Sequence, residues 1–172
     1  IGIIIAGFKV QYDTVFVANP ALWVFLPFVW FVVIKRKPSI FSIYDVYPDV
    51  GIKLGIFRNR LVIYIVSVLE KFCLKNSKVI HILAESFRPA INRMGIPNEK
   101  MFLIYPWLDL ESIKLLPKIN NFSKNYKIYD KFVILYAGNI GLSQGLNTIL
   151  KVADSLKPNK DIIFVIVGDG AG

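Results

Sequence analysis

The chain has 172 residues, of which 55% are hydrophobic and 14% aromatic, so it can build a buried core and a disordered chain is excluded. Lysine and arginine outnumber aspartate and glutamate by 21 to 12, and this excess favours anionic partners such as acidic lipid or phosphorylated substrates. A nucleic-acid partner is not expected, because the basic residues are scattered through apolar segments and no nucleic-acid-binding motif is present.

Short runs rich in β-branched and aromatic residues alternate with helical stretches along the whole chain. Several of these runs lack polar alternation, which is typical of strands buried in parallel sheets. The predicted strands are residues 14–18, 39–44, 78–83, 101–105, 132–137 and 162–167. Strands that alternate with helices in this way predict an α/β fold with parallel sheets.

The first helical stretch, residues 21–34, is an uncharged apolar run followed at once by the basic triplet 35–37. It is shorter than the roughly 20 residues that a membrane span needs, and Pro27 predicts a kink. Two interpretations stay open: a helix buried against the sheet, or a helix in the membrane interface with Trp23 and Trp30 near the headgroups. In the first case the triplet complements the helix dipole, and in the second it binds lipid phosphates. Aromatic residues on all sides of the run favour the membrane.

A second helix is predicted over residues 61–75. We expect one face of it to pack on the core, through Leu61, Ile65, Val68, Leu69 and Phe72. Cys73 and His81 are the only residues of their types, which excludes an internal disulfide and fits a reducing compartment. Both are interpreted as packing residues, Cys73 in the core and His81 in a strand.

Polar, turn-forming residues without a clear period fill residues 117–130 and mark the best domain boundary. We therefore expect a first domain over residues 1–117 and a second over 118–172. Only one strand–helix–strand unit follows the boundary, so the second domain is present as a beginning.

The strand at 132–137 runs into a glycine-rich turn, Gly138-Asn-Ile-Gly-Leu-Ser-Gln-Gly145, and then a helix. This arrangement presents backbone N–H groups and a positive helix end to a phosphate, and a diphosphate is the expected ligand. The glycine spacing fits neither the dinucleotide motif nor a P-loop, which argues against a nicotinamide-dependent or nucleotide-hydrolysing enzyme. A second glycine turn, residues 168–170, follows the next strand at the same sheet edge, and this predicts a shared site.

Residues 136–146 (YAGNIGLSQGL) and 165–170 (VIVGDG) together resemble the retaining, GT-B-fold glycosyltransferases of the group 1, or family 4, type. The upstream half agrees in its order of motifs: 43–49 (IYDVYPD), 83–87 (LAESF), 95–101 (GIPNEKM) and 104–109 (IYPWLD). The branch to which the chain is most similar makes bacterial surface polysaccharides.

The resemblance implies a GT-B-like fold of two Rossmann-type domains with parallel sheets, both incomplete here. The first domain would bind the acceptor and the second a nucleotide sugar, and no metal or other cofactor is expected because dipoles and cationic side chains neutralise the leaving diphosphate. The residues implied on the donor diphosphate and nucleotide side are Gly138, Asn139, Gly141, Gln144, Gly145, Gly168, Asp169 and Gly170. Many relatives carry Arg at the position of Asn139 and Lys at that of Gln144.

On the acceptor side the resemblance places Asp45 and Asp49 in a loop facing the cleft, as the candidate catalytic carboxylates. A carboxylate there can orient or deprotonate an acceptor hydroxyl, whereas the alternative is turn formation around Pro48. Glu85 and Ser86 would either face the cleft or, as we favour, cap the next helix.

These expectations describe a cytoplasmic enzyme, peripheral on the inner face of the plasma membrane, that moves a sugar from a nucleoside diphosphate sugar to a lipid-linked or saccharide acceptor. Both ends of the chain look severed, and the family's paired glutamates would lie beyond Gly172, so the chain alone is expected to be inactive. Two alternatives stay open: a non-catalytic truncated remnant, and a sugar-nucleotide epimerase of the same fold. The epimerase needs a histidine in the cleft, and His81 inside a strand argues against it.

Overall fold

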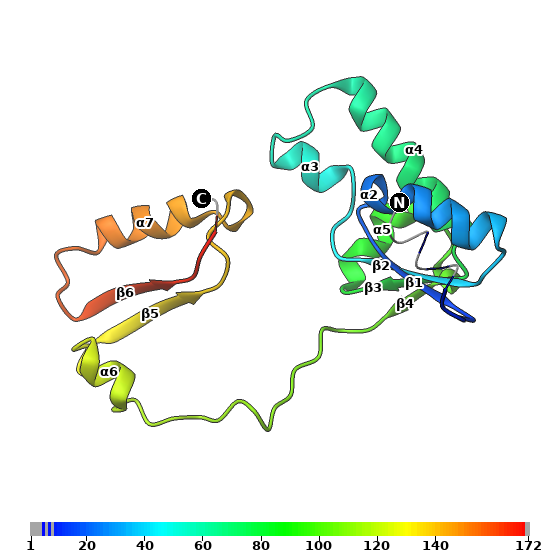
Figure 1. Cartoon of the computed structure of the whole chain (residues 1–172). Helices are drawn as coiled ribbons and strands as arrows, with labels where there is room; N and C mark the ends of the chain where they lie inside the picture. Colours follow the sequence, from blue (N-terminus) through cyan, green and yellow to red (C-terminus); the bar gives the residue numbers. More distant parts are fainter. Residues whose placement is uncertain (1–4, 6, 8, 171–172) are drawn as a thin grey trace. The chain divides into compact units, whose positions relative to one another are not determined.

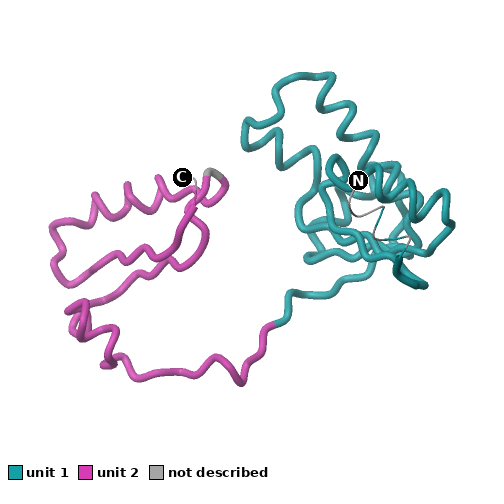
Figure 2. Tube along the Cα trace, viewed as in Figure 1, with its two compact units in different colours: residues 1–107 teal, residues 108–172 magenta. Residues whose placement is uncertain are grey.

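The computed structural model describes residues 5, 7 and 9–170, and the chain divides into two compact units, Ile1–Trp107 and Leu108–Gly172 (Figures 1 and 2). The boundary predicted after residue 117 falls inside the second unit. It lies in the coil between strand β4 (Met101–Leu103) and helix α6 (Asn121–Asn125).

Unit 1 is built on a four-stranded parallel sheet in the order β1-β2-β3-β4, with β1 at Val15–Ala18, β2 at Ser39–Ile43 and β3 at Val79–Ile82. The strands lie where the sequence predicts them, with ends that differ by one or two residues. The helical segments of the unit are α2 (Ala21–Phe28), the π-helical turn η1 (Val29–Ile34), α3 (Asp49–Lys53), α4 (Arg60–Asn76), η2 (Glu85–Phe87), α5 (Arg88–Arg93) and η3 (Asn98–Lys100). The expected α/β class with parallel sheets is confirmed.

One face of this sheet forms the core of unit 1. Alternate strand residues point to it, and they pack against helices α2, α4 and α5, which lie on this side (Figure 1). The fully buried members include Phe41 and Ile43 of β2, Ile80 and Ile82 of β3, Phe28 of α2, Leu74 of α4 and Ile91 of α5. The rings of Phe28 and Phe41 meet edge to face with their centroids 5.9 Å apart.

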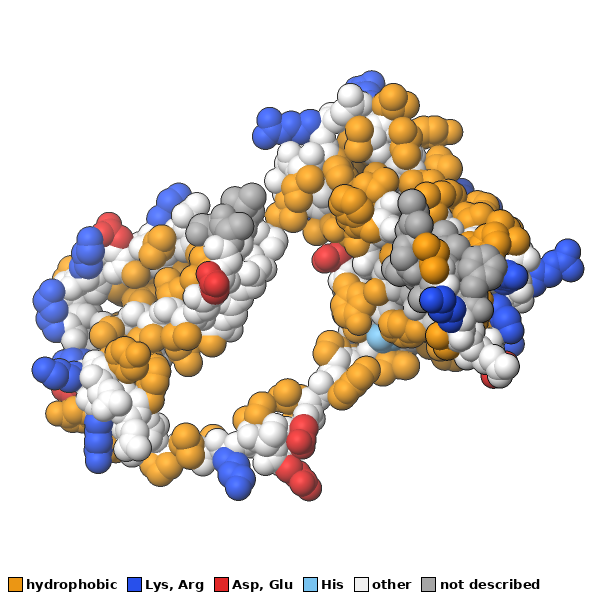
Figure 3. Space-filling model, in the orientation of Figure 1, with side chains coloured by type: hydrophobic (Ala, Val, Ile, Leu, Met, Phe, Trp, Pro, Cys, Tyr) orange, Lys and Arg blue, Asp and Glu red, His pale blue; other side chains and the backbone are white. Residues whose placement is uncertain are grey.

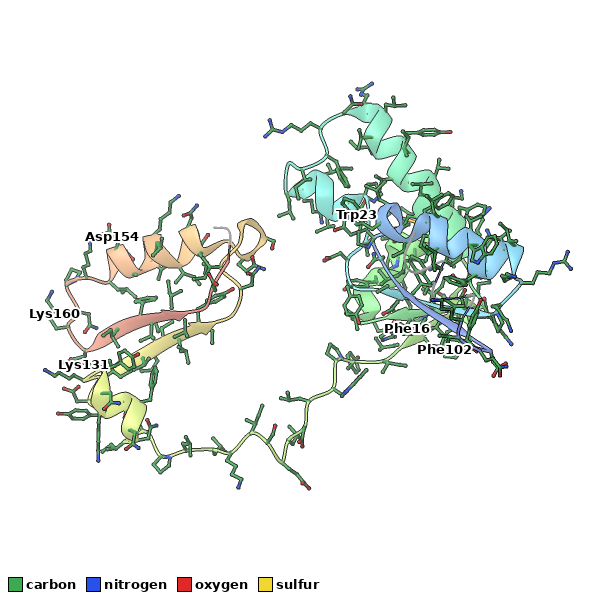
Figure 4. All side chains as sticks on the ribbon, viewed as in Figure 1. Phe16, Trp23, Phe102, Lys131, Asp154 and Lys160 are labelled. Carbon is green, nitrogen blue, oxygen red and sulfur yellow. The ribbon has the colours of Figure 1, made fainter. Side chains whose placement is uncertain are left out.

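The opposite face of the sheet is apolar and open within the described residues. Phe16 of β1 and Phe102 of β4 are both more than half exposed (Figure 4). They line a hollow of about 520 Å³ together with Ile40, Tyr44, Val79, His81, Leu83, Ile104, Pro106 and Trp107. The lack of polar alternation in the strands therefore reflects two apolar faces, of which one is covered by the helices of unit 1.

The apolar run 21–34 packs on the sheet as α2 followed by η1. Pro27 lies inside α2 and lacks the N–H that the helix would use, and two residues later the hydrogen bonds change to the wider π pattern, as in Lys35 N–H to Trp30 O at 2.9 Å. The outer side of α2 stays open, with Trp23 78% exposed (Figure 4). Among the described residues, no helix is both long and apolar enough to cross a membrane.

The prediction of which face of α4 packs on the core was right for Leu69 and Phe72, which are half-buried and pack against it, and wrong for the other three residues. Leu61, Ile65 and Val68 are exposed, and the buried stripe is Val66, Glu70, Cys73 and Leu74. Both stripes of this helix are apolar enough to be buried, and the stripe that is buried contains a carboxylate, which a hydrophobic pattern assigns to the outside.

Unit 2 contains one parallel pair, β5 (Phe132–Ala137) and β6 (Ile162–Val167), joined through the short turn η4 (Leu142–Gln144) and helix α7 (Leu146–Ser155). Both strands have the predicted bounds. Ahead of them, Asn120 and Ser123 form a reciprocal capping box that starts α6, and the buried Ile128 follows it.

Phe41 and Phe102 provide a matched test of the two sheet faces. We expect Phe41→Ala to lower the free energy of unfolding by about 3–5 kcal/mol, because it leaves a cavity between β2 and α2. Phe102→Ala removes the same group from the open face and should cost less than about 1 kcal/mol. Urea unfolding of the chain measures both changes, and equal losses would contradict the assignment of the core to one face.

Candidate functional site

Two glycine turns meet at the carboxyl ends of β5 and β6, as the sequence predicts. The N–H of Gly138 donates to the carbonyl of Val167 at 2.9 Å, and the N–H of Ile140 donates to the carbonyl of Asp169, also at 2.9 Å. The two segments therefore continue the pairing of the strands beyond the sheet. Residues 138–141 and 168–170 form one structure.

Several of the glycines are required by this close approach. A Cβ on Gly168 would lie 1.8 Å from the carbonyl oxygen of Gly138, and one on Gly170 would lie 2.1 Å from the carbonyl oxygen of Ile140. Gly145 has a φ of 63°, the left-handed region that favours glycine, and it ends the loop at the start of α7. Gly168 and Gly170 thus hold the two turns together.

The remaining donor-side candidates surround the start of α7. The side chains of Asn139 and Gln144 converge on Gly141, since a Cβ there would lie 3.0 Å from Asn139 Nδ2 and 2.8 Å from Gln144 Oε1. The first turn of α7 has no side-chain cap, so its N–H groups and positive dipole end suit an anion. The Tyr136 hydroxyl donates to the carbonyl of Asn139 at 2.7 Å and braces the turn from the strand.

In unit 1 the two candidate carboxylates, Asp45 and Asp49, line one hollow of about 410 Å³. Asp45 follows β2 and is exposed, whereas Asp49 begins α3 and lies 3.6 Å from a guanidinium nitrogen of Arg93. Ser86 lines the same hollow. The structure therefore brings the two carboxylates together, and among the ion pairs of the described residues only Asp49 has a cationic partner.

The preference for Glu85 and Ser86 as helix caps was wrong. No side-chain cap is present at η2 or α5. Glu85 instead forms a 2.6 Å ion pair with Arg88 one turn later. This hydrogen-bonded pairing lowers the pKa of Glu85.

The sequence did not lead us to predict a role for Glu70, a buried acid near the loop that carries Asp45 and Asp49. Its carboxylate is 2% exposed and accepts hydrogen bonds from the Ala21 N–H at 3.1 Å, at the start of α2, and from Asn19 Nδ2 at 3.2 Å. Asn19 also accepts from the Tyr44 N–H and donates to the Asp45 carbonyl. Glu70 is thereby connected through Asn19 to the loop that carries Asp45. An acidic residue in register with the apolar stripe of α4 was the available signal.

Burial dominates the titration behaviour of this cluster. It raises the pKa of Glu70 to about 7, and the hydrogen bonds from Ala21 and Asn19 oppose the rise only in part. Burial also raises the pKa of Tyr47, with the carboxylates of Asp45 and Glu70 adding to it. Cys73, one turn along α4, is buried and has its pKa raised to about 12, so its thiol stays protonated, as expected of a packing residue.

His81 is a packing residue, as predicted. It is buried, its Nε2 lies 3.0 Å from the carbonyl oxygen of Ile104, and its Nδ1 lies 2.8 Å from the hydroxyl of Ser42. A carbonyl only accepts, so Nε2 carries the proton, and a neutral ring takes the Ser42 hydrogen at Nδ1. Within the described residues, no group of three or more His, Cys, Asp or Glu side chains is arranged to hold a metal ion.

Comparison with known proteins finds similarity in sequence and in fold. It is 25% identical over 140 residues to WcaI of Escherichia coli (strain K12), whose name describes a colanic acid biosynthesis glycosyl transferase. The match covers 78% of this chain and 34% of WcaI. No protein-family profile matches the chain.

The fold is similar to that of Anabaena Alr3699/HepE, solved in complexes with UDP and glucose, with UDP, and with UDP-glucose. For the complex with UDP and glucose the TM-score is 0.74 at 15% identity, covering 99% of this chain and 42% of HepE. This match confirms the expected GT-B-like α/β class, and the chain spans less than half the length of either relative.

The Glu70 cluster predicts a stability that falls as pH rises. The folded-state pKa of about 7 lies above the ordinary 4.5, so between these values the folded chain binds more protons than the unfolded chain. The free energy of unfolding should therefore decrease from pH 4.5 to pH 7, by on the order of 3 kcal/mol. Urea unfolding across this range tests it. Glu70→Gln should flatten the decrease and Glu99→Gln, on the surface, should keep it, whereas a parent stability that rises over this window contradicts the role of Glu70.

The joined turns predict unequal tolerance of glycine replacement. Gly168→Ala places a methyl group against the Gly138 carbonyl and should destabilise unit 2 by roughly 2–4 kcal/mol. Gly145→Ala meets no atom within 4 Å and should cost only about 1 kcal/mol, for its positive φ. Amide hydrogen exchange of β5 and β6 reports both. Equal protection in the two variants would show that the turns do not depend on this contact.

Proposed function

We propose that the protein is a glycosyltransferase that moves a sugar from a nucleoside diphosphate sugar to a lipid-linked or saccharide acceptor in surface polysaccharide synthesis. In this proposal residues 118–172 begin the donor-binding domain and residues 1–117 belong to the acceptor-side domain. Transfer proceeds with retention of configuration and without a metal ion. The site of action is the cytoplasmic face of the plasma membrane.

The observation that carries the proposal is the pair of joined glycine turns ahead of the uncapped start of α7. Backbone N–H groups and a helix dipole suit the negative charge that develops on a departing diphosphate. Asn139 and Gln144, converging on Gly141, add amide groups that can donate to phosphate oxygens. The similarity to WcaI and the complexes of HepE with UDP and UDP-glucose support a donor of this kind.

On the acceptor side, Asp45 suits contact with a reacting hydroxyl better than Asp49. Asp45 is exposed in the hollow after β2, where its carboxylate can accept a hydrogen bond from an acceptor hydroxyl and orient its oxygen. The carboxylate of Asp49 faces Arg93, so its role is to hold α3 and α5 around the hollow. The Glu70–Asn19 contacts fix the backbone from which Asp45 projects.

The epimerase alternative is not favoured by the structure. An epimerase needs a histidine beside its catalytic carboxylates, whereas His81 lines a different hollow from Asp45 and Asp49 and has both ring nitrogens engaged by Ser42 and Ile104. No observation in the described residues favours the remnant over the enzyme.

The test uses a form of the protein extended to the length of its relatives. We expect it to transfer sugar from a nucleoside diphosphate sugar in the presence of EDTA. Asp45→Asn should lower kcat by about 100-fold with an unchanged donor KM, because the residue contacts only the acceptor. Asp49→Asn and Arg93→Gln are the matched controls and should resemble each other, with smaller losses.

Three results would contradict parts of the proposal. Loss of transfer in EDTA would overturn the metal-free mechanism. An unchanged kcat in Asp45→Asn would remove that residue from the site. If UDP fails to shift the amide resonances of residues 139–146 and no nucleoside diphosphate sugar is consumed, the donor site itself is wrong.

A further inference from the structure

The α3–α4 segment of unit 1 exposes a continuous set of large apolar side chains. They are Ile52, Leu54, Ile56, Leu61, Val62, Tyr64, Ile65 and Val68, and we call them the α3–α4 surface. Three of them, Ile56, Leu61 and Tyr64, are 63–67% exposed. Hydrophobic side chains gather over α4 in the space-filling view, with basic side chains at its end (Figure 3). Apolar groups of this size in water mark a surface that another phase or molecule covers.

Basic residues dominate the exposed charge of this segment, and the acidic Asp49 at the start of α3 is paired with Arg93. Between Val50 and Lys78 the only acidic residue is Glu70, which is buried and binds the start of α2. The exposed charged residues are all basic: Lys53, Arg58, Arg60, Lys71, Lys75 and Lys78. An apolar surface with an excess of basic residues around it complements an anionic phase.

The form of the surface favours a bilayer over a packing partner. A helix that docks in a protein groove needs one apolar stripe, but four of the five successive positions from Leu61 to Ile65 are exposed and Ile63 is half-buried. The first buried side chain of α4 is Val66. The first turn of α4 therefore extends past the part of the helix that packs on the core, and it carries apolar groups on several sides. Acyl chains can surround such a turn, whereas a single protein face cannot.

We propose that the α3–α4 surface inserts into the interface of an anionic lipid bilayer, with Lys53, Arg58 and Arg60 on the lipid phosphates. The contact is thus assigned to α3 and α4, instead of to the run 21–34, because the run itself carries no charge and Lys35 and Lys37 after it lie over the rings of Trp30 and Tyr12. The inference deepens the membrane location in the proposed function. It rests on no step of sugar transfer, since lipid binding needs neither donor nor acceptor.

The test is co-sedimentation of the 172-residue chain with vesicles of phosphatidylcholine alone or with about 30% phosphatidylglycerol. We expect at least tenfold stronger partitioning into the anionic vesicles, weakening as salt is raised. The double variant Tyr64→Asp/Ile65→Asp should lose at least tenfold. Its matched control, Ile113→Asp/Leu115→Asp, introduces the same charges at exposed apolar positions of unit 2 and should bind like the parent.

A second pair of variants separates charge from apolar contact. Arg58→Ala/Arg60→Ala should weaken binding to the anionic vesicles only, whereas Lys157→Ala/Lys160→Ala in unit 2 should leave it unchanged. Circular dichroism verifies that each variant is folded. Tyr64 and Ile65 are both exposed, so Tyr64→Asp/Ile65→Asp replaces no buried side chain.

Several outcomes would overturn the proposal. One is equal partitioning of the parent and Tyr64→Asp/Ile65→Asp, and another is loss of binding in Trp23→Asp/Leu26→Asp alone, which would assign the contact to α2. A concentration-dependent dimer abolished by the α4 variant, without vesicle binding, would assign the surface to a second copy. An extended form that no longer binds vesicles would assign it to another segment of the same protein. Vesicle binding through α4 in a protein that transfers no sugar would reject the proposed function and retain this inference.

Discussion

The arrangement of unit 1 depends on one buried carboxylate. Glu70 faces inward from α4, caps the start of α2 through the Ala21 N–H, and reaches the loops after β1 and β2 through Asn19. Burying a carboxylate is costly unless it is hydrogen-bonded, so these contacts are what allow this stripe of α4 to pack on the core. The outward turn of Leu61, Ile65 and Val68 follows from the same geometry.

Unit 2 depends on backbone contact in place of a buried charge. The turns after β5 and β6 approach so closely that side chains at Gly168 and Gly170 would overlap the carbonyl groups of the neighbouring turn. In the proposed function, this fixed backbone presents the loop and the start of α7 to the donor diphosphate, and the loop needs no cationic side chain. The neutral Asn139 and Gln144 are compatible with such a site, since the backbone N–H groups and the helix dipole supply the positive potential.

The proposed acceptor site and the proposed membrane contact adjoin in unit 1, because Lys53 lines the hollow with Asp45 and Asp49 and is also one of the basic residues around the α3–α4 surface. The proposed donor-side residues belong to unit 2, the hollow with Asp45 and Asp49 lies after β2, and the α3–α4 surface is formed by exposed side chains of α3, α4 and the segment between them. For an acceptor carried by a lipid, unit 1 would contact both the membrane around the lipid and the reacting hydroxyl. In the proposed function, the excess of basic residues therefore binds the membrane that carries the acceptor, and the donor loop needs no cation.

Local features of the sequence determined the six strands, the parallel α/β class and the glycine turns, because β-branched runs and glycine spacing act over short distances. The packing roles of Cys73 and His81 also followed from the sequence, because the chain has no second cysteine and His81 lies within an apolar strand. Only the tertiary structure decided which stripe of α4 is buried, because Glu70 is accepted in the core through an N–H and an amide that lie far away in sequence. It likewise separated Asp49, which faces Arg93, from the exposed Asp45, two residues that the sequence treats alike. Long-range contacts of this kind depend on how elements pack, and no local pattern encodes them.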